Sequence, residues 1–200
     1  MKRLHDGPAI DDAKYYERIW SEEENTRPFY DAVRMRGLAV KVLSGNIVVD
    51  IGAGVYGTVQ YIVEHEKQLT IFPVCYDQSY TARDIVIKKF PQILYFLGQL
   101  PDTYLPSDSF DVVIAGEIIE HMEEPDKLAA ELARICRPGG WVSLSTVDTT
   151  SENAIKHGPY PEHTFSFEDQ DLIDMFSPYG KVEFLILGDY QMVHCRKNNV

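Results

Sequence analysis

The sequence predicts an α/β domain in which a mostly parallel seven-stranded sheet lies between two layers of helices. Strand-like apolar runs alternate with helical patterns from residue 46 onward, which is typical of parallel strands joined by helical crossovers. A glycine-rich turn follows the first of these runs, at Gly52, Gly54 and Gly57. Two apolar runs near the C-terminus are separated only by Gly188 and Asp189, a linker too short for a parallel crossover. We therefore expect an antiparallel hairpin there.

The N-terminal part of the chain differs from the rest in pattern. The 200 residues suffice for one compact domain with a substantial core. We expect residues 1–43 to form an arm and a helical extension, and residues 44–200 to form the sheet-containing domain. The first ten residues lack a regular apolar pattern and are interpreted as a mobile arm. Apolar side chains then recur at helical spacing from residue 11 to 43, with a break near Thr26, Arg27 and Pro28.

The remaining elements follow in order from residue 46. Strands are predicted as apolar runs bounded by turn residues at 46–50, 70–76, 93–97, 111–115, 141–147, 182–187 and 190–195. Helices are predicted at 58–66 and 79–90. A third helix begins with Pro125 in its first turn, buries Leu128, Leu132 and Ile135, and ends before Pro138.

Composition limits the compartment and the partners. The chain has 44% hydrophobic and 25% charged residues, which is ordinary for a globular enzyme. Its three cysteines, Cys75, Cys136 and Cys195, lie far apart within apolar runs, so we expect buried thiols and a cytoplasmic location. No apolar run is long enough for a spanning helix, and the net charge of −12 makes nucleic acid an unfavourable substrate. A small-molecule substrate is expected, and the oligomeric state stays open.

The turn after Asp50 is the strongest indication of a ligand. Glycines at the carboxyl end of a strand allow the backbone to approach a nucleotide closely. Gly52, Gly54 and Gly57 spell G-x-G-x-x-G, which fits nicotinamide or flavin dinucleotides as well as S-adenosylmethionine. Asp77 ends the second predicted strand, where a carboxylate can meet ribose hydroxyls in either cofactor class.

Four sequence blocks in order resemble the class I S-adenosylmethionine-dependent methyltransferases, in particular their small-molecule and quinone-type members. The blocks are residues 48–57, 74–77, 110–121 and 132–140, and the final hairpin matches the antiparallel strand of that Rossmann-like three-layer fold. The resemblance implies S-adenosylmethionine as cofactor, with Asp50 near its methionine end. The cofactor-binding residues that it implies are Asp50, Gly52, Ala53, Gly54, Gly57, Asp77, Gln78, Gln99, Leu100, Gly116 and Glu117.

Two positions depart from the pattern of that family. Its glycine turn commonly reads G-x-G-x-G, whereas here Tyr56 precedes the third glycine and the turn is one residue wider. Gln99 also stands where an acidic residue usually contacts adenine, although an amide can both donate to and accept from an adenine edge. These departures leave open a member that binds cofactor or a partner protein without catalysis. An NAD(P)-dependent oxidoreductase is a further alternative, but no Tyr-x-x-x-Lys pair accompanies the glycine turn.

The candidate catalytic residues follow the fourth strand. Methyl transfer from a sulfonium chiefly requires that the acceptor be positioned, with a base where the acceptor holds its proton tightly. His121 is the first choice as base because it lies at the sheet edge where cofactor and substrate should meet, and its unperturbed pKa is near neutral. Glu117 and His163 are the next candidates, and Glu120 and His157 are further possible bases. The alternative is a purely structural role, in which His121 orients the loop backbone by hydrogen bonds.

The same residues suggest a metal centre as an alternative. Glu117 and Glu120 share one face of a helical turn, and His121 with His163 could complete a site for Mg²⁺, Mn²⁺ or Zn²⁺. This resembles metal-dependent O-methyltransferases, including small-RNA 2′-O-methyltransferases. We favour the simpler interpretation, in which Glu120 caps a helix and His121 lines the pocket.

Aromatic residues in two segments could shape the site. Residues 159–167 carry three aromatic side chains and two prolines after the fifth strand, which suggests a wall for an apolar or aromatic acceptor. Tyr15, Tyr16 and Trp20 lie on the first predicted helix and could close over the cofactor, although aromatics at helical spacing more often belong to a core.

Overall fold

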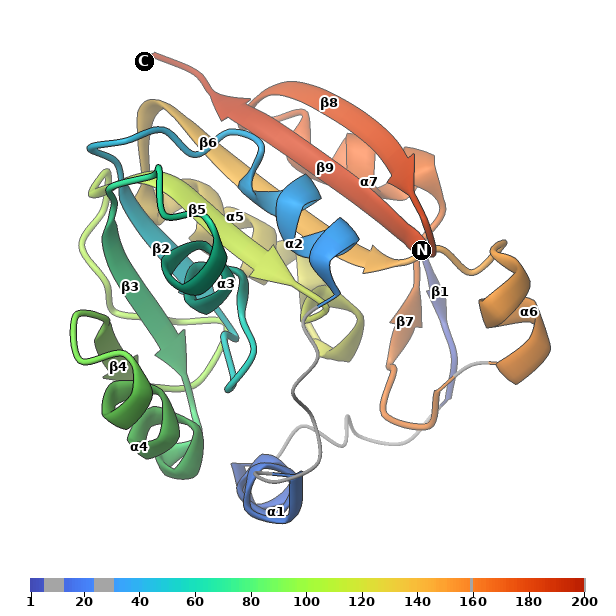
Figure 1. Cartoon of the computed structure of the whole chain (residues 1–200). Coiled ribbons are helices and arrows are strands. Elements are labelled where there is room, and N and C mark those ends of the chain that lie inside the picture. Colours follow the sequence, from blue (N-terminus) through green and yellow to red (C-terminus); the bar gives the residue numbers. More distant parts are fainter. Residues whose placement is uncertain (6–12, 24–30, 159, 200) are drawn as a thin grey trace.

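A computed structural model describes residues 1–5, 13–23, 31–158 and 160–199 of the chain. Its centre is a seven-stranded sheet in the order β4-β3-β2-β5-β6-β9-β8 (Figure 1). The strands are β2 (Ile47–Ile51), β3 (Phe72–Asp77), β4 (Leu94–Leu97), β5 (Phe110–Gly116), β6 (Cys136–Val147), β8 (Gly180–Leu187) and β9 (Tyr190–Lys197). The first five are parallel, and β9 runs antiparallel to both β6 and β8. The predicted sheet with its C-terminal hairpin is confirmed.

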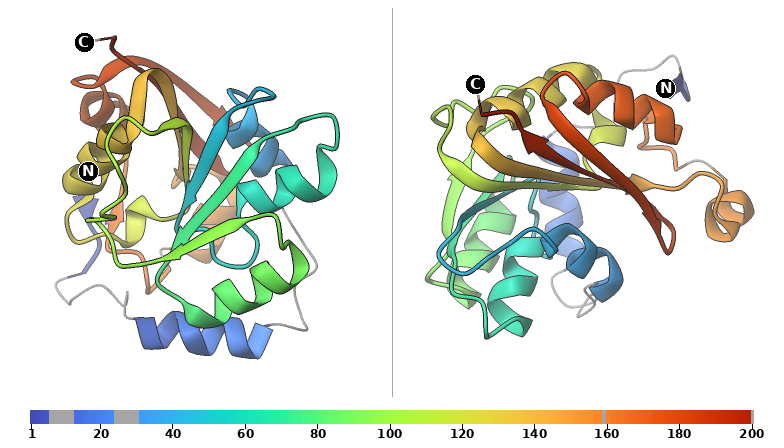
Figure 2. Two further views of the ribbon diagram at one scale, coloured as in Figure 1. Left: turned by 90° about the vertical axis from the view of Figure 1, so that its left-hand side faces the viewer. Right: turned by 90° about the horizontal axis from the view of Figure 1, so that it is seen from above.

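Helices cover both faces of this sheet, which gives the predicted three layers (Figure 2). One layer packs around Leu38, Val59 and Val86, and the opposite layer packs around Leu128 and Leu172. The helices are α1 (Ala13–Glu23), α2 (Ala32–Ala39), α3 (Thr58–His65), α4 (Tyr80–Lys89), α5 (Pro125–Ile135), α6 (Glu152–His157) and α7 (Asp169–Phe176), with a single 3₁₀ turn, η1, at Ile119–His121. The central strands β2 and β5 are thereby largely buried on both faces, as their continuous apolar runs require, whereas Leu94 and Phe96 of edge strand β4 are exposed.

Local chemistry sets the helix starts that position the site. Ser79 is the N-cap of α4, and its hydroxyl accepts the amide of Ala82 at 3.0 Å. Pro125 opens α5, where its missing N–H costs nothing. Gly57 is the N-cap of α3, so this helix begins directly after the glycine turn. The parallel strands β2, β3 and β5 are thus followed by helices that begin at the same edge of the sheet.

The junction after α5 differs from the prediction. The helix ends at Ile135, and β6 begins at once with Cys136, so Pro138 lies inside a strand of 12 residues. The register between β5 and β6 shifts in this stretch, between Phe110 and Val112. A proline has no amide for a regular ladder, and a shifted register tolerates it at the end of the strand.

The N-terminal residues also differ from the prediction. Lys2 and Arg3 form strand β1, which pairs with β7 (Phe165–Ser166), and Leu4 donates its amide to Thr164. The mobile-arm prediction is therefore wrong for residues 2–4, because a two-residue strand leaves no periodic pattern and its partner lies far along the chain. The rest of that proposed arm and the break at residues 26–28 lie largely outside the described residues.

The crossover from β4 to β5 carries no helix within residues 98–109, unlike the crossovers through α3, α4 and α5. Instead, α5 holds this segment through Glu131, whose carboxylate accepts the amide of Thr103 at 2.9 Å. Arg134 also donates to the carbonyl of Leu105 at 2.7 Å. The segment leads from Gln99 at the pocket to β5, so α5 indirectly supports one wall of the site.

Candidate functional site

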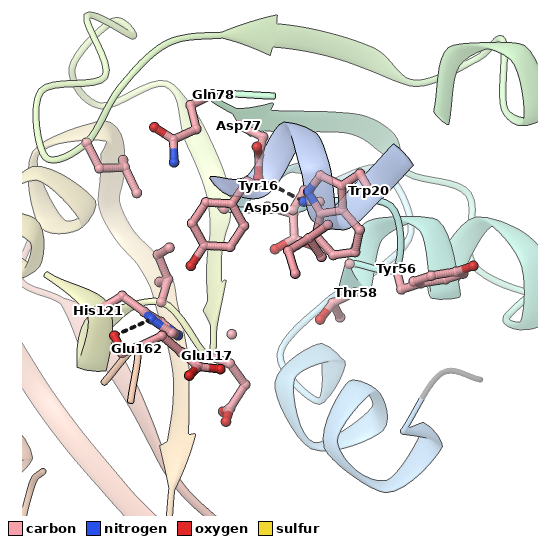
Figure 3. Close-up of a pocket in the computed structure, with 18 of the residues that line it drawn as sticks. Tyr16, Trp20, Asp50, Tyr56, Thr58, Asp77, Gln78, Glu117, His121 and Glu162 are labelled. Atoms are coloured by element: carbon pink, nitrogen blue, oxygen red, sulfur yellow. Dashed lines mark hydrogen bonds between the residues drawn. The ribbon is translucent and has the colours of Figure 1, made fainter. Parts of the chain in front are cut away.

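A cavity of about 630 Å³ opens at the carboxyl ends of β2, β3 and β5, and α1 and α2 close its other side (Figure 3). All the residues that the family resemblance assigned to the cofactor lie in its lining: Asp50, Gly52, Ala53, Gly54, Gly57, Asp77, Gln78, Gln99, Leu100, Gly116 and Glu117. They come from four separate parts of the chain, which the parallel sheet brings together. The cavity therefore coincides with the predicted nucleotide site.

The glycine turn has the conformation that its sequence requires. Gly52 and Gly54 have φ values of 70° and 50°, a region that side-chain-bearing residues rarely occupy. Gly57 is needed for space, since a Cβ there would lie 2.5 Å from an oxygen of Asp50. Tyr56, the additional residue of this wider turn, lines the cavity.

Two buried carboxylates hold the turn in place. Asp50 is 2% exposed, and its Oδ2 accepts the amide of Val59 at 3.0 Å in the first turn of α3. Asp77 accepts the amide of Gly54 at 2.9 Å and that of Ser79 at 2.9 Å, so it ties the turn to the start of α4. Burial raises the pKa of Asp50 to about 6, and burial also raises the pKa of Asp77. Both side chains have backbone partners, and both also face the cavity.

The opposite wall carries the candidate catalytic groups. Glu117 follows β5 with a φ of 55°, and Ser145 donates to its carboxylate at 2.8 Å. Burial raises the pKa of Glu117, and the neighbouring charge of Glu120 raises it further; burial likewise raises the pKa of Glu120. His121 lies next to this pair in η1 and also lines the cavity.

His163 lies beside His121 but outside this cavity. The two rings meet edge to face with their centroids 4.9 Å apart. Burial lowers the pKa of His163 to about 4, and the charge of His121 adds to the effect. With Glu120, His163 lines a second cavity of about 570 Å³ beside β7 and α6. The predicted catalytic set is therefore divided between two cavities that share a wall.

Three of the four residues in the proposed metal set come together. One ligand atom from each of Glu120, His121 and His163 lies within 4.8 Å of the others, whereas Glu117 is outside this group and bonds to Ser145 instead. Glu120 is 1% exposed, and neither carboxylate oxygen has a hydrogen-bond partner among the described residues. A buried carboxylate with two imidazoles is a donor set that fits Mn²⁺, Fe²⁺ or Zn²⁺.

Sequence reasoning missed several charged residues of the cavity, namely Asp31, Arg34 and Glu162. Arg34 on α2 lines it, and its guanidinium lies over the ring of Tyr190 with 5.5 Å to the centroid. Its Nε is buried and has no hydrogen-bond partner among the described residues. No motif surrounds Arg34, and only the packing of α2 against the sheet brings it to the site.

Comparison with known proteins identifies the class. The family described as "Methyltransferase domain" matches residues 49–144. A ubiquinone biosynthesis O-methyltransferase of Thiobacillus denitrificans is 28% identical over 162 residues, which are 72% of this chain and 66% of that protein. A probable S-adenosylmethionine-dependent methyltransferase of Mycobacterium tuberculosis is 26% identical over 119 residues, 59% of this chain and 43% of that protein. The chain thus spans about two thirds or less of the length of these relatives.

Solved structures show the same fold. A chain of the "Complex between the Haloferax volcanii Trm112 methyltransferase activator and the putative methyltransferase" matches with a TM-score of 0.76, 15% identity and coverage of 95% of this chain and 100% of that one. A possible histamine N-methyltransferase from Thermotoga maritima has a TM-score of 0.72, 18% identity and coverage of 92% and 99%.

Together with the cavity, these findings support a class I S-adenosylmethionine-dependent methyltransferase with S-adenosylmethionine as its cofactor. In the described parts of the chain, no helix is both long and apolar enough to cross a membrane.

Proposed function

We propose that the protein transfers a methyl group from S-adenosylmethionine to a small-molecule acceptor, at oxygen or carbon. One observation carries this proposal: a single cavity has the glycine turn, Asp50 and Asp77 on one side and Glu117 and His121 on the other. A donor bound along the turn and an acceptor beside His121 would therefore share one enclosed space. The name of the Thiobacillus relative supports oxygen as the acceptor atom.

The cofactor's parts match the groups of the first wall. The backbone at Gly52 and Gly54 allows close approach, and Asp77 retains lone pairs for ribose hydroxyls beside its bonds to the turn. Gln78, Gln99 and Leu100 form the adenine end. The unpartnered Nε of Arg34 suits the cofactor's carboxylate, and the charge of Asp50 suits its ammonium.

The tautomer of His121 follows from its hydrogen bond. Its Nδ1 lies 3.1 Å from the carbonyl oxygen of Glu162, which can only accept, so Nδ1 carries the proton in the neutral ring. Nε2 is then the basic nitrogen of the neutral ring, the one that can take the proton of an acceptor hydroxyl. The bound cofactor supplies an activated methyl group, and these residues orient the acceptor and exclude water.

Calorimetry and a matched histidine pair test this function. We expect S-adenosylhomocysteine to bind with a micromolar Kd and NAD or NADP not to bind. His121→Asn should lower kcat about a hundredfold or more and leave the Kd for S-adenosylhomocysteine unchanged. His157→Asn on the exposed face of α6 is the control. NAD binding without S-adenosylhomocysteine binding would favour an oxidoreductase instead, and cofactor binding with no transfer to any acceptor would favour a non-catalytic member.

A second candidate is a metal-assisted O-methyltransferase. Its support is the group of Glu120, His121 and His163, together with the unpartnered carboxylate of Glu120. A divalent cation there would lower the pKa of an acceptor hydroxyl near His121. Metal analysis after dialysis, with thermal unfolding in the presence of Mg²⁺, Mn²⁺ or Zn²⁺, tests it. We expect stabilisation by one of these ions that Glu120→Gln abolishes, and full activity in metal-free protein would refute the metal centre.

We also propose a cytoplasmic location. The three cysteines are free thiols and are buried, which fits a reducing compartment. Fractionation of cells that express the tagged protein would test this.

A further inference from the structure

Helix α1 forms the roof of the cofactor cavity. Tyr15, Tyr16, Ile19 and Trp20 from this helix all line it, and Figure 3 shows Tyr16 and Trp20 over the site. The ring of Trp20 lies so close to the glycine turn that a Cβ on Gly54 would be 2.5 Å from its Cζ2. A ligand lying along the turn therefore has this helix above it.

The roof offers groups to both halves of the cavity. The indole N–H of Trp20 is buried and has no hydrogen-bond partner among the described residues, so a bound cofactor could accept it. Tyr16 meets His121 edge to face, with 6.5 Å between the ring centroids. Displacement of α1 would thus uncover the glycine turn and the candidate base together.

The side chain of Glu17 links α1 to the main domain. The carboxylate of Glu17 accepts the backbone amides of Tyr80 and Thr81, the latter at 3.1 Å, in the first turn of α4. Figure 2 shows α1 running alongside α4 at the carboxyl edge of the sheet. These amides have no partner within their own helix, and a carboxylate at a helix N-terminus also interacts favourably with the helix dipole. Burial raises the pKa of Glu17, but hydrogen bonds from Thr81 and Tyr80 outweigh burial and lower it, so the group stays ionised.

We infer that Glu17 is a positioning residue that locks α1 onto α4, and that the cofactor enters and leaves when this contact opens. The inference rests on the proposed cofactor site but assigns a separate property, the rate of exchange. Among the described residues, α1 covers the cavity on that side, and the hydrogen bonds that the Glu17 carboxylate accepts from α4 hold it there. Removal of the carboxylate should therefore speed release without changing the groups that touch the cofactor.

Release kinetics of S-adenosylhomocysteine test the lock. Trp20 reports on the site when Trp141→Phe removes the other tryptophan of the chain. In this background, Glu17→Ala should raise the dissociation rate about tenfold or more, as expected for the loss of hydrogen bonds to a charged group. Glu17→Asp keeps a carboxylate, so its dissociation rate should lie between those of the wild type and Glu17→Ala. Lys14→Gln, exposed on the same helix, is the matched control.

Hydrogen exchange separates a lock from a general loss of structure. We expect faster exchange of the α1 amides in Glu17→Ala, unchanged exchange in β2 and β5, a raised KM for the cofactor and an unreduced kcat. Equal dissociation rates in Glu17→Ala and Lys14→Gln would overturn the lock while leaving the cofactor site intact. Absence of S-adenosylhomocysteine binding in the wild type would instead overturn the proposed function and the lock with it.

Discussion

Asp50 illustrates at the residue scale how the site lowers the stability of the fold. Its carboxylate is buried, and although it accepts the amide of Val59, burial still raises its pKa from 3.8 to about 6. The carboxylate is therefore harder to ionise in the folded state than in the unfolded state. As a result, the free energy of unfolding falls as the pH rises from about 4 to above 6. A cationic ligand beside Asp50 would relieve that cost.

We expect Asp50→Asn to raise the free energy of unfolding at pH ~7.5 by about 1–3 kcal/mol and to weaken S-adenosylhomocysteine binding. The amide oxygen can still accept from Val59, so the start of α3 should be kept. Urea unfolding at about pH 4.5 and about pH 7.5 measures the effect, and the gain should shrink at the lower pH because Asp50 is then protonated. A variant less stable than the wild type at both pH values would contradict this account.

At the element scale, sequence reasoning located the strands and the helices that have their own signals. Ser79 and Pro125 marked helix starts, and the run before Asp50 marked the central strand. Strand β1 and helix α6 show no apolar period, because β1 pairs with β7 at long range and α6 has no buried face, although Ser151 caps α6. The same limit applies to the site: the turn residues follow from a motif, whereas Arg34 reaches the cavity only through the packing of α2.

The segment between β4 and β5 depends on α5 in place of a helix of its own. Glu131 accepts from Thr103 and pairs with Arg134 at 2.6 Å. Burial raises the pKa of Glu131, but the bonds from Arg134 and Thr103 outweigh it and lower the pKa. Since a depressed pKa contributes stability above the unfolded value, this support should be lost as the pH falls through the folded pKa.

We expect Glu131→Gln to speed hydrogen exchange across residues 98–109 and to weaken S-adenosylhomocysteine binding a few-fold, because Gln99 and Leu100 line the cavity in which we propose that the cofactor binds. Glu124→Gln, at the start of the same helix α5, serves as control because it removes only an exposed ion pair with Lys127. Unchanged exchange in residues 98–109 would show that Glu131 does not hold the segment.

At the scale of the whole molecule, the negative net charge and the size of the cavity both make a polynucleotide an unfavourable substrate. The chain carries 31 acidic and 19 basic residues, a net charge of −12. Many basic side chains are already paired with carboxylates, as in Lys41 with Glu183 and Lys89 with Glu64. Nucleic-acid affinity depends largely on free Lys and Arg that replace counterions at phosphates. The cofactor cavity of about 630 Å³ matches a cofactor and a small acceptor.

We therefore expect a labelled RNA of about 20 nucleotides to bind with a Kd weaker than ~10⁻⁴ M at about 150 mM salt. Fluorescence anisotropy with protein saturated by S-adenosylhomocysteine measures this, and a basic RNA-binding domain serves as positive control. The same protein should be stabilised by added salt, because screening reduces the repulsion among its acidic side chains. Tight, salt-sensitive RNA binding would show that a local basic groove outweighs the net charge, and the acceptor would then have to be sought among RNAs.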